Sequence, residues 1–215
     1  MTVDVQVLVL AKEPVPGRVK TRLCPPLTPA QAADVAAAAL ADTLDAVRAA
    51  RVARRVLVTD GTLGAEGFDV QRQRGGPLDE RLAASLDDAA AACDLPALLI
   101  GMDTPQVSAA LLTRAAAVLT RTPAVLGRSV DGGWWALGLQ RPDGALLRGV
   151  PTSRGDTGQR QLARLRGAGL SPVRLPVLCD VDTAADAVAV ARQVPGSRFA
   201  RVVTEAFSAP AARAV

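Results

Sequence analysis

"VDVQVLVLA", residues 3 to 11, is an apolar run, and the segment that follows it, "KEPVPGRVKTRLCPP" (residues 12 to 26), is basic and rich in proline. Val and Leu dominate the first segment, which is typical of a buried strand. The second segment carries four cations within eleven residues. In an open, mainly parallel sheet, ligands bind beyond the carboxyl ends of the strands. The basic segment therefore stands where such a fold would hold an anion.

Short β-rich runs alternate with longer helical patterns along the rest of the chain. Further strands are predicted at 55–60, 68–73, 97–103, 124–129, 133–139 and 172–181. Helices are predicted from 29 onward, with Thr28 as the N-cap, and at 78–93, 106–121, 157–167, 183–194 and 198–207. This alternation predicts βαβ units, and apolar strands predict helices on both faces of the sheet. The sequence thus indicates an α/β protein, a three-layer α/β/α sandwich with a mainly parallel central sheet, folded as one domain over residues 1–215.

Composition narrows the class of partner. Hydrophobic residues make up 49% and charged residues 21%, as in soluble globular proteins. The net charge is +4, but the basic residues are interspersed with acidic ones, which disfavours a nucleic-acid partner. No apolar run approaches the ~18 residues that a membrane span needs, and the three cysteines fit no metal spacing. We expect a cytoplasmic protein with free thiols and no membrane partner, and the oligomeric state stays open.

The basic segment is the first candidate site. Its cations Lys12, Arg18, Lys20 and Arg22 surround a Pro-Gly turn at Gly17, which lets the backbone approach a ligand closely. It is not a Walker A loop, because Val19 stands where that motif has a glycine before the lysine. The alternative is an ordinary solvated turn. So many cations at the end of a strand favour a site for phosphate groups.

Two aspartates are candidate metal ligands. Asp103 ends an apolar strand in "LLIGMDTP", where a carboxylate needs a cation or a capping role. Thr104 can take the capping role instead, which would leave Asp103 free. In "CDVDTAAD", either Asp182 or Thr183 caps the following helix. Because Mg²⁺ needs only one or two carboxylates besides phosphate oxygens and water, Asp103 and Asp182 would suffice if they converge.

"SVDGGWWALGL", residues 129 to 139, contains Asp131, Gly132, Gly133 and both tryptophans. Neighbouring strand residues point to opposite faces, so at most one of Trp134 and Trp135 faces the pocket and the other belongs to the core. We take Trp134 as the candidate binding residue. The glycines suggest close approach of the backbone to a ligand, and a type I′ hairpin turn explains them equally well.

Two polar segments have an open interpretation. "QRQRGG", residues 71 to 76, offers Gln73 and Gly75 to a nucleobase, but by itself it reads as a surface loop. "SRGDTGQRQ", residues 153 to 161, fits a lid or an acceptor wall, or equally a simple entry into a helix. Since the chain has no His and no Tyr, its chemistry would rest on carboxylates, cations, a metal or thiols, which suits phosphoryl or glycosyl transfer.

Taken together, these motifs resemble a bacterial family of GT-A-like transferases that is related to the nucleotide-diphospho-sugar transferases and long filed as a domain of unknown function. The pattern K-x-P-x-P-G-x-V-K-T-R-L of that family is complete from Lys12 to Leu23. Its Q-x-G-x-L-x-E-R-L pattern recurs at 73–82 with one extra residue, and G-S-D-x-P, D-G-G-Y-Y-L-I-G-L and D-V-D-T-P-E-D read "GMDTP", "DGGWWALGL" and "DVDTAAD" here. Three departures are Met102, the altered loop before Leu78, and Ala184 in place of proline.

The resemblance implies a Rossmann-like GT-A fold, a diphosphate near Lys20 and Arg22, and Mg²⁺ or Mn²⁺ on Asp103 and Asp182. It implies a nucleotide or nucleotide-sugar and a small-molecule acceptor as partners. The leading hypothesis is glycosyl transfer from a nucleotide-diphospho-sugar, with Lys20 assisting the metal and Asp131 as base for the acceptor hydroxyl. The alternatives are a nucleotidyltransferase that releases pyrophosphate, and a nucleotide-binding protein without catalysis.

Overall fold

The computed structural model describes residues 1–208 and has a central sheet of seven strands in the order β3-β2-β1-β4-β6-β5-β7. All neighbouring strands are parallel except β6, which runs antiparallel to β4 and β5. The strands are β1 (Val3–Ala11), β2 (Val52–Thr59), β3 (Asp69–Arg72), β4 (Ala97–Gly101), β5 (Ala124–Ser129), β6 (Trp134–Leu139) and β7 (Val173–Leu178). The prediction of a mainly parallel sheet is confirmed.

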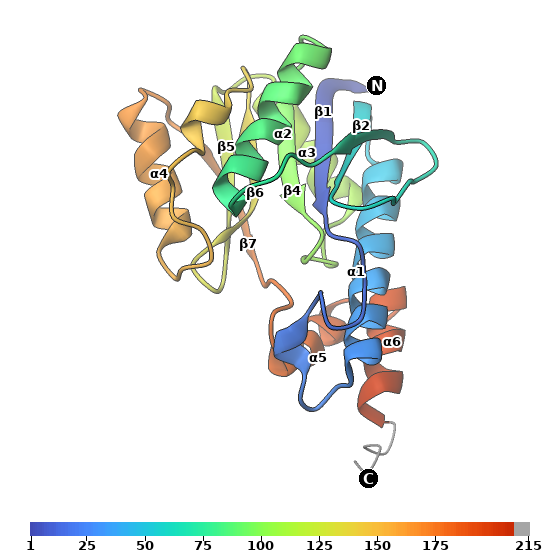
Figure 1. The fold of residues 1–215 in the computed structure, drawn as a ribbon. Coiled ribbons are helices and arrows are strands. Elements are labelled where there is room, and N and C mark those ends of the chain that lie inside the picture. The colour runs from blue at the N-terminus through green and yellow to red at the C-terminus, as the bar shows by residue number, and fades with distance from the viewer. Residues whose placement is uncertain (209–215) are drawn as a thin grey trace.

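Helices cover both faces of this sheet, as predicted for a three-layer sandwich (Figure 1). They are α1 (Pro29–Ala49), α2 (Leu78–Ala92), α3 (Ala109–Leu119), α4 (Thr157–Gly167), α5 (Ala184–Gln193) and α6 (Arg198–Ser208), with short 3-10 turns η1 (Thr21–Leu23) and η2 (Gly144–Leu146). α1 and α3 share one core cluster with the sheet, and α2 and α4 share the other. In Figure 1, β1 runs down into the basic segment, which lies beside α5 and α6 in the lower part of the view.

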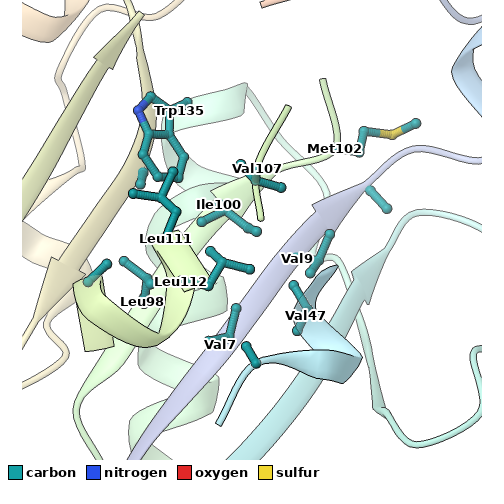
Figure 2. Packing of buried hydrophobic residues seen from close by; sticks show 14 of the residues in the cluster. Val7, Val9, Val47, Leu98, Ile100, Met102, Val107, Leu111, Leu112 and Trp135 are labelled. Atoms are coloured by element: carbon teal, nitrogen blue, oxygen red, sulfur yellow. The ribbon is translucent and has the colours of Figure 1, made fainter. Parts of the chain in front are cut away.

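The two-residue period of the strands divides the core between these faces. Val7 and Val9 of β1 belong to the cluster with α1 and α3, whereas Leu8 belongs to the cluster with α2. Figure 2 shows Val7 and Val9 in the same cluster as Leu112 of α3, with Met102 beside the end of β1. The sheet is therefore buried on both faces, and polar chemistry is confined to its edges and ends.

A third cluster lies at the carboxyl edge of the sheet and anchors the basic segment. Leu23 and Leu27 are buried there against the first half of α1 and against α5 and α6. Phe199 of α6 is completely buried in the same cluster. The segment between β1 and α1 is thus attached at its far end by apolar packing, and its cations are held near the ends of the strands.

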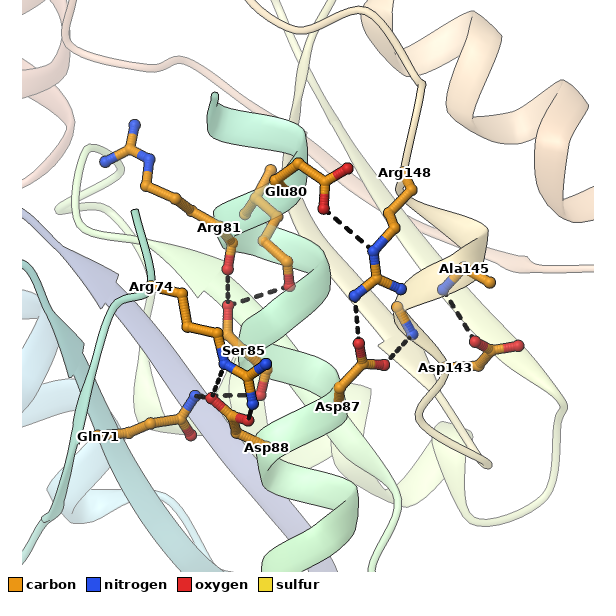
Figure 3. Close-up of polar contacts among 12 residues, drawn as sticks. Gln71, Arg74, Glu80, Arg81, Ser85, Asp87, Asp88, Asp143, Ala145 and Arg148 are labelled. Carbon is orange, nitrogen blue, oxygen red and sulfur yellow. Dashed lines mark hydrogen bonds and ion pairs between the residues drawn. The ribbon is translucent and has the colours of Figure 1, made fainter. Parts of the chain in front are cut away.

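Ion pairs attach the chain between β6 and α4 to the side of α2 (Figure 3). The Arg148 guanidinium bonds to Asp87 and lies 3.1 Å from Glu80 Oε2. Asp87 Oδ1 also accepts the Gly144 N–H at 2.8 Å, and a Cβ on Gly144 would come within 2.5 Å of the Ala83 carbonyl. These contacts fix η2, and the loop that follows it runs to the carboxyl edge of the sheet.

Most element boundaries agree with the sequence prediction to within two residues, and three were wrong by three residues. β2 begins at Val52 and not at 55, and β7 ends at Leu178 and not at 181. α3 begins at Ala109 and not at 106, because Ser108 is its N-cap and accepts the Leu111 N–H. The cysteines are free thiols, as predicted. Among the described residues, no helix combines the length and apolarity that crossing a bilayer requires.

The cap of α1 gives a first prediction. Thr28 Oγ1 accepts the Gln31 N–H, and the Gln31 side chain accepts the Thr28 N–H at 2.8 Å, so both halves of a capping box are present. Thr28→Ala is expected to lower the free energy of unfolding by about 1 kcal/mol. Urea denaturation measures this, and Thr28→Ser, which keeps the hydroxyl, is the control. Equal stability of Thr28→Ala and wild type would contradict a role for the cap.

Candidate active site

A cleft of about 880 Å³ lies at the carboxyl edge of the sheet. Its volume is in the range of pockets that hold small molecules and cofactors. Several separate parts of the chain line it: the end of β1 with the basic segment, Gln73 with the start of α2, the end of β4, the β5–β6 turn, the loop before α4, and residues 180–186. Six cations and five carboxylates take part: Lys12, Arg18, Lys20, Arg22, Arg81 and Arg154, with Asp103, Asp131, Asp180, Asp182 and Asp186.

The basic segment contains the predicted Pro-Gly turn. Arg18 N–H donates to the Val15 carbonyl at 3.0 Å, and Gly17 has a φ of 77°. Proline followed by a glycine with positive φ is the pattern of a type II turn. Lys12 Nζ closes the segment by donating to the Arg18 carbonyl at 2.7 Å. The lysine at the start of the segment therefore shapes the loop in this structure.

Lys20 is the most constrained residue of the segment. Its backbone lies in the left-handed region with a φ of 47°, and its side chain is only 8% exposed. The ammonium Nζ lies 2.6 Å from Asp103 Oδ1 and 3.5 Å from Asp182 Oδ1. Burial alone would lower the pKa of Lys20, but the charge and hydrogen bond of Asp103, with the charges of Asp182 and Asp180, raise it above its ordinary value. Lys20 is therefore a charged ammonium between two carboxylates.

The two predicted metal ligands converge through local structure. The Val181 N–H donates to the Asp103 carbonyl at 2.9 Å, which joins the segment after β7 to the end of β4. Thr183 is the N-cap of α5, with Asp186 completing a capping box, so Asp182 is not used as the cap. Asp103 does not cap a helix either, because α3 begins only after Ser108. For the same reason, the alternative prediction that Thr104 caps this helix was wrong.

A third carboxylate lies beside this pair. Burial, together with the charges of Asp131, Asp103 and Asp182, raises the pKa of Asp180 to about 7, although the Ser129 hydroxyl donates to Asp180 at 3.0 Å and opposes the shift. Three carboxylates, Asp103, Asp182 and Asp180, thus act on one buried ammonium, and Asp131 acts on Asp180. Such a cluster has more negative charge than Lys20 can neutralise, and it favours a further cation.

This donor set fits a hard divalent ion. Within residues 1–208, no group of three or more acidic, Cys or His side chains is arranged as a complete metal site. Asp103 and Asp182 supply two carboxylates that already converge on a cation, and both are more than one third exposed. Mg²⁺ commonly binds through one or two carboxylates and takes its other ligands from phosphates and water. The residues present fit an ion that enters with a phosphate ligand.

The β5–β6 connection presents Asp131 at the cleft. It is a hairpin, as one of the two interpretations of this segment predicted, but its turn is not of type I′, which needs positive φ at both central residues. Within this turn only Gly132 has a positive φ, at 90°. The Gly133 N–H donates to Asp131 Oδ1 at 2.8 Å and orients the carboxylate.

The two tryptophans lie on opposite faces. Both tryptophans line the cleft, but Trp135 is 2% exposed and donates from its indole nitrogen to the Pro176 carbonyl at 2.9 Å. A Cβ on Gly127 would lie 2.5 Å from the Trp135 ring, so the core around this ring is tightly packed. The hairpin therefore contributes to the cleft and to the core at once.

The loop before α4 packs on the glycines of this hairpin. A Cβ on Gly132 would lie 1.9 Å from the Gly155 carbonyl oxygen, and one on Gly158 would lie 2.3 Å from that of Gly133. The Gly158 N–H donates to the Gly132 carbonyl at 2.8 Å. Residues 152–155 line the cleft beside Asp131. The segment leads into α4, as one interpretation predicted, and it forms a wall of the cleft; a role as a lid or in contact with an acceptor stays a prediction.

Gln73 lines the cleft, and its side-chain amide makes hydrogen bonds within the protein. Its amide nitrogen donates to the carbonyls of Ala11 at 2.7 Å and Val58 at 3.1 Å, and its amide oxygen accepts from Arg81 Nη1 at 3.2 Å. Gln73 therefore joins the ends of β1 and β2 and holds Arg81.

Sequence reasoning missed Arg81. Its Nε is buried and has no hydrogen-bond partner among the described residues, and the side chain lines the cleft. Figure 3 shows it leaving α2 on the side away from Arg148. The sequence feature that could have identified Arg81 is its position in the E-R-L pattern, one helical turn after Leu78.

Three predicted residues do not line the cleft, namely Gly17, Gly75 and Gly132. Gly17 and Gly132 are needed for their positive φ, and Gly75 is exposed with open space around its Cα. The departure at Met102 has a structural role, because the buried Met102 accepts the Lys12 N–H on its sulfur at 3.2 Å.

Comparison with known proteins identifies relatives of this architecture. The family described as "Uncharacterized protein conserved in bacteria (DUF2064)" matches residues 28–154. A candidate nucleotide-diphospho-sugar transferase from Desulfovibrio desulfuricans G20 is 23% identical, with a TM-score of 0.86 over 97% of this chain and 96% of that one. Rv0371c from Mycobacterium tuberculosis H37Rv, crystallised with manganese, is 24% identical, with a TM-score of 0.56 over 88% and 98%.

A synthetase for CMP:2-keto-3-deoxy-manno-octonic acid, crystallised with CTP, is 12% identical, with a TM-score of 0.57 over 94% of this chain and 99% of that one. Among curated proteins, none matches this sequence. Identities below 25% establish a shared fold and confirm the expected α/β architecture. The chemistry of this chain has to be argued from its own residues.

Proposed function

The chain belongs to the bacterial DUF2064 family, and from that premise we propose that it is a metal-dependent transferase acting on a nucleotide-linked substrate, by glycosyl transfer from a nucleotide-diphospho-sugar to a small acceptor. The observation that carries the proposal is the convergence of Asp103 and Asp182 on one cation in a cleft rimmed by Lys12, Arg18 and Arg22. Carboxylates that can hold a metal, beside the cations of the basic segment, are what a diphosphate requires.

The basic segment would hold the diphosphate. The Arg22 side chain is 72% exposed, so its guanidinium is accessible to an anion in the cleft. It lies 3.5 Å from Asp182, beside one of the two proposed metal ligands. Asp103 and Asp182 would hold Mg²⁺ or Mn²⁺, which when bound would neutralise charge on the leaving diphosphate. A fold shared with a protein crystallised with manganese supports this assignment.

The β5–β6 hairpin would face the acceptor. Asp131 Oδ1 is held by the Gly133 N–H, and its second carboxylate oxygen makes no hydrogen bond to any described residue. That oxygen can accept the proton of an acceptor hydroxyl. Trp134 would supply an apolar surface for a sugar or acceptor ring.

A nucleotidyltransferase is the second candidate, favoured by the shared fold with a synthetase crystallised with CTP and by the number of cations in the cleft. In that reaction a substrate phosphate would attack the nucleotide, and Asp131 would have no proton to remove. A nucleotide-binding protein without catalysis would use the same phosphate site.

The released product separates these functions. In the presence of Mn²⁺, transfer of the sugar from a nucleotide-diphospho-sugar to an acceptor is expected to release a nucleoside diphosphate. Slow hydrolysis of the nucleotide-diphospho-sugar by water is expected to release the same product. A coupled assay measures it. Pyrophosphate released from a nucleoside triphosphate would establish the second candidate instead. Nucleotide binding with neither product, across a panel of sugar donors and sugar phosphates, would contradict catalysis.

A further inference from the structure

Lys20 occupies the position between the two proposed metal ligands. Its Nζ contacts Asp103 Oδ1 at 2.6 Å and Asp182 Oδ1 at 3.5 Å. We propose that Lys20 is a displaceable cation that couples the two ligands of this site: it occupies the metal position in the free protein and moves to the diphosphate when nucleotide binds. This inference rests on the proposed function, because it requires both a metal and a nucleotide.

The ammonium and a divalent ion would compete for the same two carboxylates. Lys20 Nζ lies beside Oδ1 of Asp103 and Oδ1 of Asp182, so a metal held by these two side chains would have to compete with the ammonium for them. An ammonium at 2.6 Å and a metal at ~2.1 Å cannot share this position. In the free protein, metal entry therefore has to separate Lys20 from Asp103.

The left-handed backbone conformation of Lys20 indicates that its contacts hold the residue in place. A φ of 47° is unfavourable for a residue with a side chain, and such conformations persist only where the surroundings enforce them. The neighbours that enforce it here are the buried Val19 and Leu23, on either side, and the two carboxylates. A diphosphate between Arg18 and Arg22 would offer Lys20 a second anionic partner within the same segment.

Movement of Lys20 would make the binding of metal and nucleotide cooperative. When Lys20 bonds to phosphate, Asp103 loses its cation and Asp182 keeps only its contact with Arg22, so both carboxylates gain affinity for a metal. By linkage, the metal then favours nucleotide binding by the same factor. A fixed structural ion pair would give no such contribution from Lys20.

The decisive measurement is Mn²⁺ binding to the full chain without nucleotide, from the electron paramagnetic resonance signal of free Mn²⁺. Lys20→Met removes the competing ammonium and is expected to raise Mn²⁺ affinity about tenfold or more. Lys12→Met is the matched control, because Lys12 lines the same cleft but bonds to the Arg18 carbonyl. It removes the same charge, and its effect is expected to be under about threefold. Lys20→Gln, with a folding check by circular dichroism, serves as the second neutral variant.

A second arm repeats the titrations with GDP, UDP and CDP. In wild type, the nucleotide that binds is expected to raise Mn²⁺ affinity more than it does in Lys20→Met. If wild type binds metal and nucleotide but neither Lys20 variant binds free Mn²⁺ more tightly, or if Lys12→Met has an equal effect, displacement is wrong and the proposed function stands. If no variant binds Mn²⁺ or any nucleotide, the proposed function fails with it.

Discussion

Asp103→Asn is expected to reduce turnover about a thousandfold, because a metal that stabilises a leaving diphosphate contributes several kcal/mol to the transition state. The substitution keeps the size of the side chain, and its amide oxygen can still accept from Lys20, so the fold should persist. Asp182 alone would remain as a charged metal ligand in contact with Lys20. Mn²⁺ affinity in the presence of nucleotide is expected to fall with turnover.

Asp34→Asn is the control for this change. Asp34 lies on the exposed side of α1, so the control removes one carboxylate charge away from the cleft. Its turnover and Mn²⁺ affinity should equal those of wild type. An Asp103→Asn protein with wild-type turnover and Mn²⁺ affinity would show that Asp103 is not a metal ligand.

Gly158→Ala is expected to destabilise the protein although alanine is the better helix former. The added Cβ would lie 2.3 Å from the Gly133 carbonyl oxygen and 3.0 Å from that of Gly132, and both contacts are backbone atoms. Overpacking of this kind costs about 2 kcal/mol. Relief would move the hairpin that carries Asp131 and Trp134, so activity should fall as well.

Gly167→Ala is the matched control in the same helix, α4. Gly167 is exposed, and its Cβ would meet no atom within 4 Å. There the usual gain of about 0.5–1 kcal/mol from alanine should appear. Thermal unfolding measures the stability of both variants, and near-ultraviolet circular dichroism reports changes in the packing around the tryptophans. A Gly158→Ala protein as stable as Gly167→Ala would contradict the close contact between α4 and the hairpin.

The fold was largely predictable because its signals are local. The apolar run of β1 has the predicted bounds, Val3–Ala11, and Thr28 caps α1 as its position before Pro29 indicated. The start of α3 was not predictable from periodicity, since residues 104–108 are compatible with a helix until Ser108 is seen to cap Leu111. β6 runs antiparallel because it forms a hairpin with β5. The sequence did not decide between this hairpin and a ligand-binding loop.

The site was predictable in its residue types and less so in its contacts. Asp103, Asp182 and Lys20 were each singled out by their place after a strand, but their convergence depends on tertiary packing between distant parts of the chain. The sequence placed Lys20 at the phosphates, whereas the structure pairs it with both carboxylates. Gln73 shows the same limit, since its carbonyl partners come from two other strands.

The central claim is that this cleft binds a nucleotide together with a divalent metal, and calorimetric titration of the wild-type protein with GDP, UDP and CDP, with and without Mn²⁺, tests it most directly. We predict that at least one of the three binds, and that Mn²⁺ tightens its binding about tenfold or more, as for a ligand that completes the metal site. Nucleotide binding of equal affinity with and without Mn²⁺, and unchanged in Asp103→Asn, would contradict the account.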